Sequence, residues 1–215
     1  MGRGCLITIE GIDGAGKTTL AAALAHELMT RSPERRIELL REPGGVEAAE
    51  RIRALVKDRA LAFVPRAEAL LYAAARAQLI EERIGPLLAE DAIVLLDRFV
   101  DSSLAYQGGG RGLGVEPVRA INRFATGSIV PDRTLLLRIE PAEGRRRRHG
   151  RAEEIDRMES EDEHFYTAIA AAYEELARAE PQRIRVLDGE QAPERVLADA
   201  LVALGDLSLS PPDSH

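Results

Sequence analysis

The chain has 215 residues, of which 45% are hydrophobic and 30% charged, with a formal net charge of -7 and one cysteine. This length suits one α/β domain, and the acidic balance argues against general nucleic-acid binding, which requires a basic surface. A lone cysteine excludes a disulfide framework. No stretch resembles a signal peptide, and none reaches the roughly 20 apolar residues of a membrane span. We therefore expect a cytoplasmic protein.

Short apolar runs alternate with stretches of helical periodicity along the chain. The expected strands are residues 5–9, 36–41, 93–96, 134–139 and 183–187. The expected helices are residues 17–31, 46–57, 66–89, about 101–107, about 115–125, 142–178 with an interruption near 145–151, and 192–204. A glycine run at 108–110 is expected to break the fourth helix, and the tail 206–215 to be loose and disordered. This alternation predicts a parallel sheet within a single domain over residues 1–205.

A glycine-rich segment between the first strand and the first helix fits the pattern G-x-x-x-x-G-K-[ST]. Its residues are Gly11, Ile12, Asp13, Gly14, Ala15, Gly16, Lys17 and Thr18, followed by Thr19. Main-chain N–H groups of such a loop wrap an anion, and the start of the helix adds partial positive charge. Lys17 can bridge the β- and γ-phosphates of a nucleoside triphosphate, and Thr18 can hold Mg²⁺. A tight strand–helix turn that matches by chance is the alternative.

The residue that ends the third expected strand, Asp97, is a candidate second ligand near Mg²⁺. A solvated strand end or a helix cap is the other interpretation. Arg98 follows it directly, and an acidic and a basic residue at the carboxyl end of a parallel strand lie where open α/β sheets bind ligands. We therefore predict that Thr18 and Asp97 hold the metal ion together.

Other segments narrow the class of phosphate-loop protein. They are Arg41-Glu42-Pro43-Gly44-Gly45, the run from Tyr72 to Gln78, Asp97-Arg98-Phe99, the run from Ser102 to Gly112, and Asp156-Arg157-Met158-Glu159. In this combination the chain resembles the thymidylate kinase family from about residue 5 to residue 204. One motif departs from the family pattern, because Phe99 stands where the family has Tyr or His. The resemblance implies a three-layer P-loop NTPase fold of the nucleoside monophosphate kinase type, with a five-stranded parallel sheet and a mobile lid at about 142–157.

The resemblance also implies the reaction, in which ATP and Mg²⁺ convert dTMP to dTDP for dTTP biosynthesis. Tyr72 would stack on thymine, and a stacked base is worth roughly 1–3 kcal/mol. Arg76, one helical turn further on, would donate to thymine O4 and reject the amine of cytosine. Tyr106 would disfavour a ribose hydroxyl. The implied substrate-binding residues are Glu10, Asp13, Arg41, Pro43, Tyr72, Arg76, Arg98, Ser102, Ser103, Tyr106 and Gln107.

An arginine-rich stretch precedes the Asp-Arg-Met-Glu motif, at Arg145, Arg146, Arg147, Arg148 and Arg151. A solvated basic helix face is the plain interpretation. The phosphate loop holds Gly14 and Ala15 and no arginine, so the resemblance is to the bacterial enzymes, in which the lid supplies this charge. Arg151 is the first choice for the transferring phosphoryl group, and Arg147 for packing on the adenine of ATP. The implied catalytic residues are Lys17, Arg98, Arg151 and Asp13.

Two alternatives stay open at this point. Another pyrimidine (deoxy)nucleoside monophosphate kinase would share most of these motifs. A nucleotide-dependent switch or binding module would lack turnover. The expected partners are ATP and dTMP, with no nucleic acid and no membrane, and the resemblance implies a homodimer.

Overall fold

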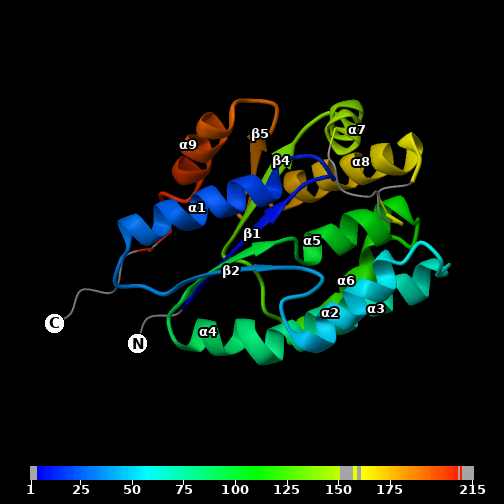
Figure 1. The fold of residues 1–215 in the computed structure, drawn as a ribbon, viewed down its shortest axis with the longest axis horizontal. Helices are drawn as coiled ribbons and strands as arrows, with labels where there is room; N and C mark the ends of the chain where they lie inside the picture. Colours follow the sequence, from blue (N-terminus) through cyan, green and yellow to red (C-terminus); the bar gives the residue numbers. More distant parts are fainter. Residues whose placement is uncertain (1–3, 151–156, 159–160, 208, 210–215) are drawn as a thin grey trace.

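The computed structural model describes residues 4–150, 157–158, 161–207 and 209 (Figure 1). Within these residues the chain forms a five-stranded sheet in the order β2-β3-β1-β4-β5, with every neighbouring pair parallel. The strands are β1 (Cys5–Glu10), β2 (Ile37–Arg41), β3 (Ile93–Asp97), β4 (Arg133–Arg138) and β5 (Ile184–Asp188). The predicted α/β class and the parallel five-stranded sheet are confirmed.

Helices cover both faces of the sheet, as Figure 1 shows. They are α1 (Lys17–Arg31), α2 (Glu47–Lys57), α3 (Pro65–Leu79), η1 (Ile80–Ile84), α4 (Gly85–Ala89), α5 (Val100–Ser103), η2 (Leu104–Gly110), α6 (Val115–Thr126), α7 (Pro141–His149), α8 (Glu163–Ala179) and α9 (Pro193–Ala203). Alternate residues of β1 point to opposite faces, so Ile7 and Ile9 pack in a core with α1, α8 and α9, while Leu6 packs with η1 and α4. Two apolar faces explain why the central strands read as continuous hydrophobic runs.

Strand register brings the ends of β1, β2 and β3 to one edge of the sheet. Ile9 of β1 and Arg41 of β2 both lie opposite Asp97 of β3. The segments that follow these strands, beginning at Gly11, Glu42 and Arg98, therefore start side by side. This edge is where parallel α/β sheets bind their ligands.

The predicted helix break at the glycine run is wrong, because helical structure continues through Gly110 as η2. These glycines serve close packing on α8. A Cβ atom at Gly109 would lie 2.7 Å from the Cβ of Ala172, and one at Gly110 would lie 2.6 Å from the ring of Phe165. The predicted interruption near 145–151 also begins too early, since α7 continues to His149.

The expected tail over 206–215 falls largely outside the described residues. Of the part that is described, Asp206 pairs with Arg133 at 2.6 Å, and the Leu209 carbonyl accepts a hydrogen bond from Ser32 Oγ at 3.3 Å. In the described part of the chain, no helix is both long and apolar enough to cross a bilayer.

Candidate active site

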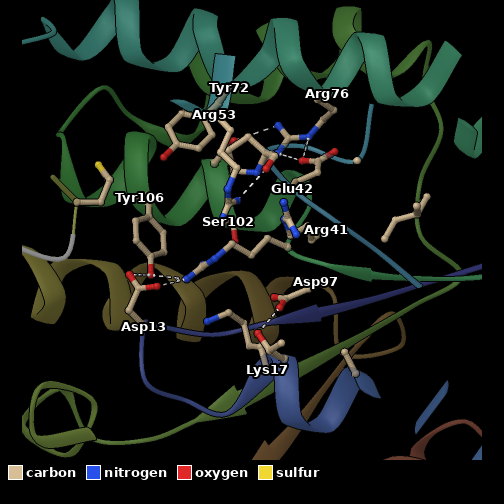
Figure 2. Close-up of a pocket in the computed structure, with 18 of the residues that line it drawn as sticks. Asp13, Lys17, Arg41, Glu42, Arg53, Tyr72, Arg76, Asp97, Ser102 and Tyr106 are labelled. Atoms are coloured by element: carbon tan, nitrogen blue, oxygen red, sulfur yellow. Dashed lines mark hydrogen bonds and ion pairs between the residues drawn. The ribbon is translucent and has the colours of Figure 1, made fainter. Parts of the chain in front are cut away.

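A cleft of about 530 Å³ lies at the carboxyl edge of the sheet (Figure 2). Of the residues expected at the site, its lining includes Asp13, Gly14, Gly16, Lys17, Thr18, Thr19, Arg41, Pro43, Tyr72, Arg76, Asp97, Arg98, Ser102, Ser103, Tyr106 and Gln107. This volume lies in the range of small-molecule sites, which is about 300–1,000 Å³. The phosphate loop and the segments that follow β2 and β3 therefore share one cavity.

The phosphate loop folds back over the start of α1, and Gly16 takes a left-handed φ of 95° at the helix N-cap. Lys17 is buried and donates from Nζ to the Ile12 carbonyl at 2.8 Å. Burial, assisted by the nearby charge of Arg98, lowers the pKa of Lys17 from its usual 10.5 to about 8. The carboxylates of Asp13, Asp97 and Glu10 act in the opposite direction but do not cancel this effect. A buried ammonium on an anion-binding loop is a ready partner for a polyanion.

Thr18 Oγ1 donates to Asp97 Oδ2 at 2.7 Å, so the two expected metal ligands lie together. In the described part of the chain, no group of three or more His, Cys, Asp or Glu residues could hold a metal ion. Mg²⁺ commonly takes one or two protein oxygens, with waters and phosphates as its other ligands. The hydroxyl and the carboxylate fit such a site.

Asp13 and Arg98 both line the cleft and form a polar cluster, and Figure 2 shows Asp13 with Tyr106 beside it. Arg98 pairs with Asp13 Oδ1, and the hydroxyl of Tyr106 donates to Asp13 Oδ2 at 2.8 Å. Burial would raise the pKa of Asp13, but the charges of Arg98 and Lys17 outweigh it and lower the pKa well below the usual range. Arg98 has a left-handed φ of 71°, which is uncommon for a residue with a side chain and typical of functional sites.

Glu10 is fully buried below this cluster and holds the first turn of α5. Its carboxyl accepts hydrogen bonds from the Phe99 amide at 2.8 Å, from Ser102 Oγ at 2.5 Å and from the Tyr173 hydroxyl at 2.9 Å. Burial raises the pKa of Glu10 to about 7, and the charge of Asp101 adds to this effect. Glu10 does not line the cleft, but it fixes Ser102, which does.

Arg76 is fully buried on α3 and its guanidinium is surrounded by acceptors. Nε donates to Glu42 Oε2 at 2.7 Å, and the second terminal nitrogen donates to the Phe99 carbonyl at 2.9 Å. The first terminal nitrogen donates to Ser103 Oγ at 3.0 Å and to Asn122 Oδ1. The guanidinium also lies 5.3 Å from the centroid of the Phe99 ring. This network fixes the position of Arg76 at the wall of the cleft.

The comparisons with known proteins agree with this geometry. Residues 9–200 match the family described as thymidylate kinase. The chain belongs to the thymidylate kinase family. It is 45% identical over 196 residues to the thymidylate kinase of Bacillus licheniformis, covering 90% of this chain and 92% of that protein. It is 47% identical over 204 residues to the thymidylate kinase of Oenococcus oeni, covering 94% and 95%.

A solved structure shows the same arrangement of the chain. The crystal structure of thymidylate kinase from Ehrlichia chaffeensis superposes with a TM-score of 0.79 at 28% sequence identity, covering 95% of this chain and 100% of that one. As a member of the thymidylate kinase family, the chain is an enzyme that phosphorylates dTMP with ATP.

The remaining expected residues of this thymidylate kinase family member lie outside the lining. Gly11, Ile12 and Ala15 belong to the phosphate loop but do not line the cleft. Arg147, expected at adenine, donates to the Gly189 carbonyl at 2.9 Å and to Glu143 at 2.6 Å. Arg151, the first choice for the transferring group, falls outside the described residues.

Two residues that hold lining residues of the cleft, Glu68 and Asn122, were not singled out by the sequence. Glu68 is fully buried and accepts hydrogen bonds from Gln107 at 3.0 Å, from Arg111 at 3.2 Å and from Arg157 at 2.7 Å. It lies one helical turn before Tyr72, so helical spacing was a signal that could have found it. Asn122, which holds Arg76, carries no comparable signal, because it comes from a distant helix.

Proposed function

We propose that the cleft binds ATP over the phosphate loop and dTMP between α3 and η2, so that the γ-phosphoryl group passes between them. The observation that carries this proposal is the single cavity that Lys17, Arg98 and Tyr72 all line. An anion-binding loop with a buried lysine supports one end as the triphosphate site. An aromatic ring on the opposite wall supports the other end as the site of a base.

On the acceptor side, Tyr72 of α3 lines the cavity (Figure 2). Its ring would be the platform for thymine. Arg76 and Ser103 are hydrogen-bonded to each other at 3.0 Å and lie at the edge that the base would present. Because the arginine can only donate, this edge favours the O4 acceptor of thymine over the amine of cytosine. The five N–H groups of Arg76 already face protein acceptors, so a bond to O4 would share one of them.

The acceptor phosphate of dTMP would lie between Arg41 and Arg98. Arg41 is half-exposed at the rim and donates to Glu50 at 2.9 Å, while Arg98 is held by Asp13 and Ser102. Guanidinium groups suit this task because their planar donors match phosphate oxygens. Tyr106, 2.8 Å from Asp13, would pack against the sugar and disfavour a ribose hydroxyl.

The transfer itself requires no general base, since a phosphate monoester with a second pKa near 6 is largely ionised at neutral pH. Lys17, Arg98 and Arg151 of the lid neutralise the charge of the transferring group, and the cleft aligns the two substrates. Thr18 and Asp97 would hold Mg²⁺, which when bound supplies charge neutralisation at the phosphates. Asp13 keeps Arg98 oriented and stands near the sugar.

We also propose that a second copy of the chain covers a face formed by α2, α3 and α6. These helices lie side by side (Figure 1) and carry exposed apolar side chains at Leu55, Leu70 and Phe124, the last with 94% of its surface exposed. Exposed apolar side chains gathered on neighbouring helices are typical of interfaces. Phe124→Glu should shift sedimentation from dimer to monomer, whereas Val202→Glu on α9 should leave it unchanged. A dimer that survives Phe124→Glu contradicts this assignment.

A coupled assay of ADP release tests the proposed function. ATP is supplied alone and with dTMP, dUMP, dCMP, UMP or AMP, and dTMP should give the strongest stimulation. Tyr72→Ala should raise KM for dTMP by about 5- to 150-fold, the range that corresponds to 1–3 kcal/mol of stacking, while Tyr72→Phe keeps the ring and should change little. Strongest stimulation by another monophosphate supports a different pyrimidine kinase, and ATP binding without stimulation supports a binding module.

A further inference from the structure

The helix α7 lies directly on the phosphate loop. Figure 1 shows it beside the turn between β1 and α1. A Cβ atom at Gly144 of α7 would lie only 2.8 Å from the main-chain oxygen of Asp13, and one at Gly14 of the loop would lie 2.5 Å from the oxygen of Gly144. Two glycines thus allow the helix and the loop to touch backbone to backbone, and any charge on this side of α7 acts on the loop at short range.

Arg148 differs from the other arginines of α7. Arg145, Arg146 and Arg147 are paired with the carboxylates of Glu163 or Glu143. Arg148 is 6% exposed, and among the described residues no carboxylate lies within ion-pair distance of it. Burying a guanidinium without a counter-ion costs free energy. Groups other than a carboxylate must therefore stabilise the charge of Arg148.

Within the described residues, the hydrogen bond and the ring contact of Arg148 are made to the phosphate loop and to a tyrosine that touches it. A terminal nitrogen of Arg148 donates to the Asp13 carbonyl oxygen at 3.1 Å, and the guanidinium lies 3.9 Å from the centroid of the Tyr166 ring. The hydroxyl of Tyr166 in turn donates to Asp13 Oδ2 at 3.3 Å. Asp13 is therefore held at its main chain by α7 and at its side chain by α8.

The Asp13 carbonyl and the Gly14 N–H belong to the same peptide unit. Gly14 lines the cleft, and within the described residues its N–H donates to no protein acceptor. A positive donor on the carbonyl polarises the peptide and strengthens the N–H as a donor, because linked hydrogen bonds reinforce one another. The stacked ring of Tyr166 adds a cation–π contact that keeps the guanidinium in this position.

We propose that Arg148 is a positioning residue for ATP: it fixes and polarises the Asp13–Gly14 peptide from behind, so that the Gly14 N–H binds the triphosphate more strongly. This role differs from that of a lid arginine over the transferring group, and it rests on the proposed binding of ATP over the loop. Arg148 would bring a positive charge to the phosphate loop. The loop itself holds Gly14 and Ala15 and no arginine.

The test compares Arg148→Met, Arg148→Lys and the control Arg146→Met by calorimetric titration with ATP and, separately, with dTMP. Arg148→Met keeps the contact with Tyr166 but loses the charge, and it should weaken ATP binding by about tenfold with dTMP binding changed less than twofold. Arg148→Lys keeps a charge without the planar donor and should lie between Arg148→Met and the unaltered protein. Arg146 is 76% exposed at its side chain, and Arg146→Met should leave both affinities unchanged.

The amide proton shift of Gly14 gives a readout that a merely structural role would not move. It should shift upfield in ligand-free Arg148→Met, because the peptide loses its polarising donor. A lower melting temperature with unchanged ATP affinity and an unchanged Gly14 shift would overturn the inference, as would equal losses for ATP and dTMP. If the unaltered protein binds neither nucleotide, the proposed function fails first, and that result is distinguishable from a failure of Arg148 alone.

Discussion

Glu10 makes the stability of the protein depend on pH in a direction that can be calculated. The side chain is fully buried, and burial together with the charge of Asp101 raises its pKa from 4.5 to about 7. Between these values the folded protein keeps the proton and the unfolded chain loses it. Stability from this group is therefore fully present below pH 4.5 and is lost as the pH rises to about 7. At 1.36 kcal/mol for each pKa unit, the loss is about 3 kcal/mol.

The perturbation is Glu10→Gln, which keeps the shape and cannot ionise. Its amide can still accept from the Phe99 N–H and donate to the oxygens of Ser102 and Tyr173, the groups that surround Glu10. Urea unfolding of both proteins at pH 4.5 to 8 gives the free energy of unfolding at each pH. The difference between variant and unaltered protein should move by about 3 kcal/mol in favour of the variant across this range.

A matched control is Glu90→Gln, whose carboxylate is 64% exposed and pairs with Arg36 at the surface. Because this carboxylate is solvated at the surface, the substitution serves as a control for removing a carboxylate that is not buried. A Glu10→Gln difference that does not change with pH would contradict this prediction, because it would mean that Glu10 titrates at the same pH in the folded and unfolded chains. A difference that grows toward acid pH would show a pKa lowered by hydrogen bonds, with burial the weaker effect.

Three further predictions concern the cleft. Arg76→Met should cost about 3–5 kcal/mol of folding free energy, measured by urea unfolding, because it leaves the Glu42 carboxylate buried without its cation. Adding Glu42→Gln to the same chain should restore part of the lost stability. ATP affinity should fall as the pH rises above about 8, by up to about tenfold per pH unit, because Lys17 loses its proton there. In Lys17→Arg, the affinity for ATP measured at about pH 7 to 9.5 should not change with pH. Gly144→Ala should raise KM for ATP several-fold and leave KM for dTMP unchanged in steady-state assays, since its Cβ would press on the Asp13 carbonyl.

Much of the site could be predicted from the sequence because its parts follow strand ends. The phosphate loop after β1, the arginine that ends β2 and the arginine after β3 lie at the same edge because the strands are parallel. The spacing of Tyr72 and Arg76 on one helical face was equally informative. These features depend on local periodicity and on the direction of the strands.

The contacts between segments far apart in the chain could not be predicted in this way. Asn122 holds Arg76 across a gap of 46 residues, and Glu68 links α3 to Arg157 across 89. Neither pairing leaves a pattern in one sequence, because each depends on how segments far apart in the chain pack together. The glycines at 109 and 110 were misinterpreted for the same reason, since a glycine that allows close packing looks the same in sequence as one that ends a helix.

A crystal structure with dTMP and a non-hydrolysable ATP analogue would test most directly whether the two nucleotides share this cleft. The thymine ring should stack on Tyr72, the dTMP phosphate should lie between Arg41 and Arg98, and the γ-phosphate of the analogue should lie beside Lys17. A thymine bound away from Tyr72, or a triphosphate that does not contact the loop at residues 11–18, would contradict this arrangement.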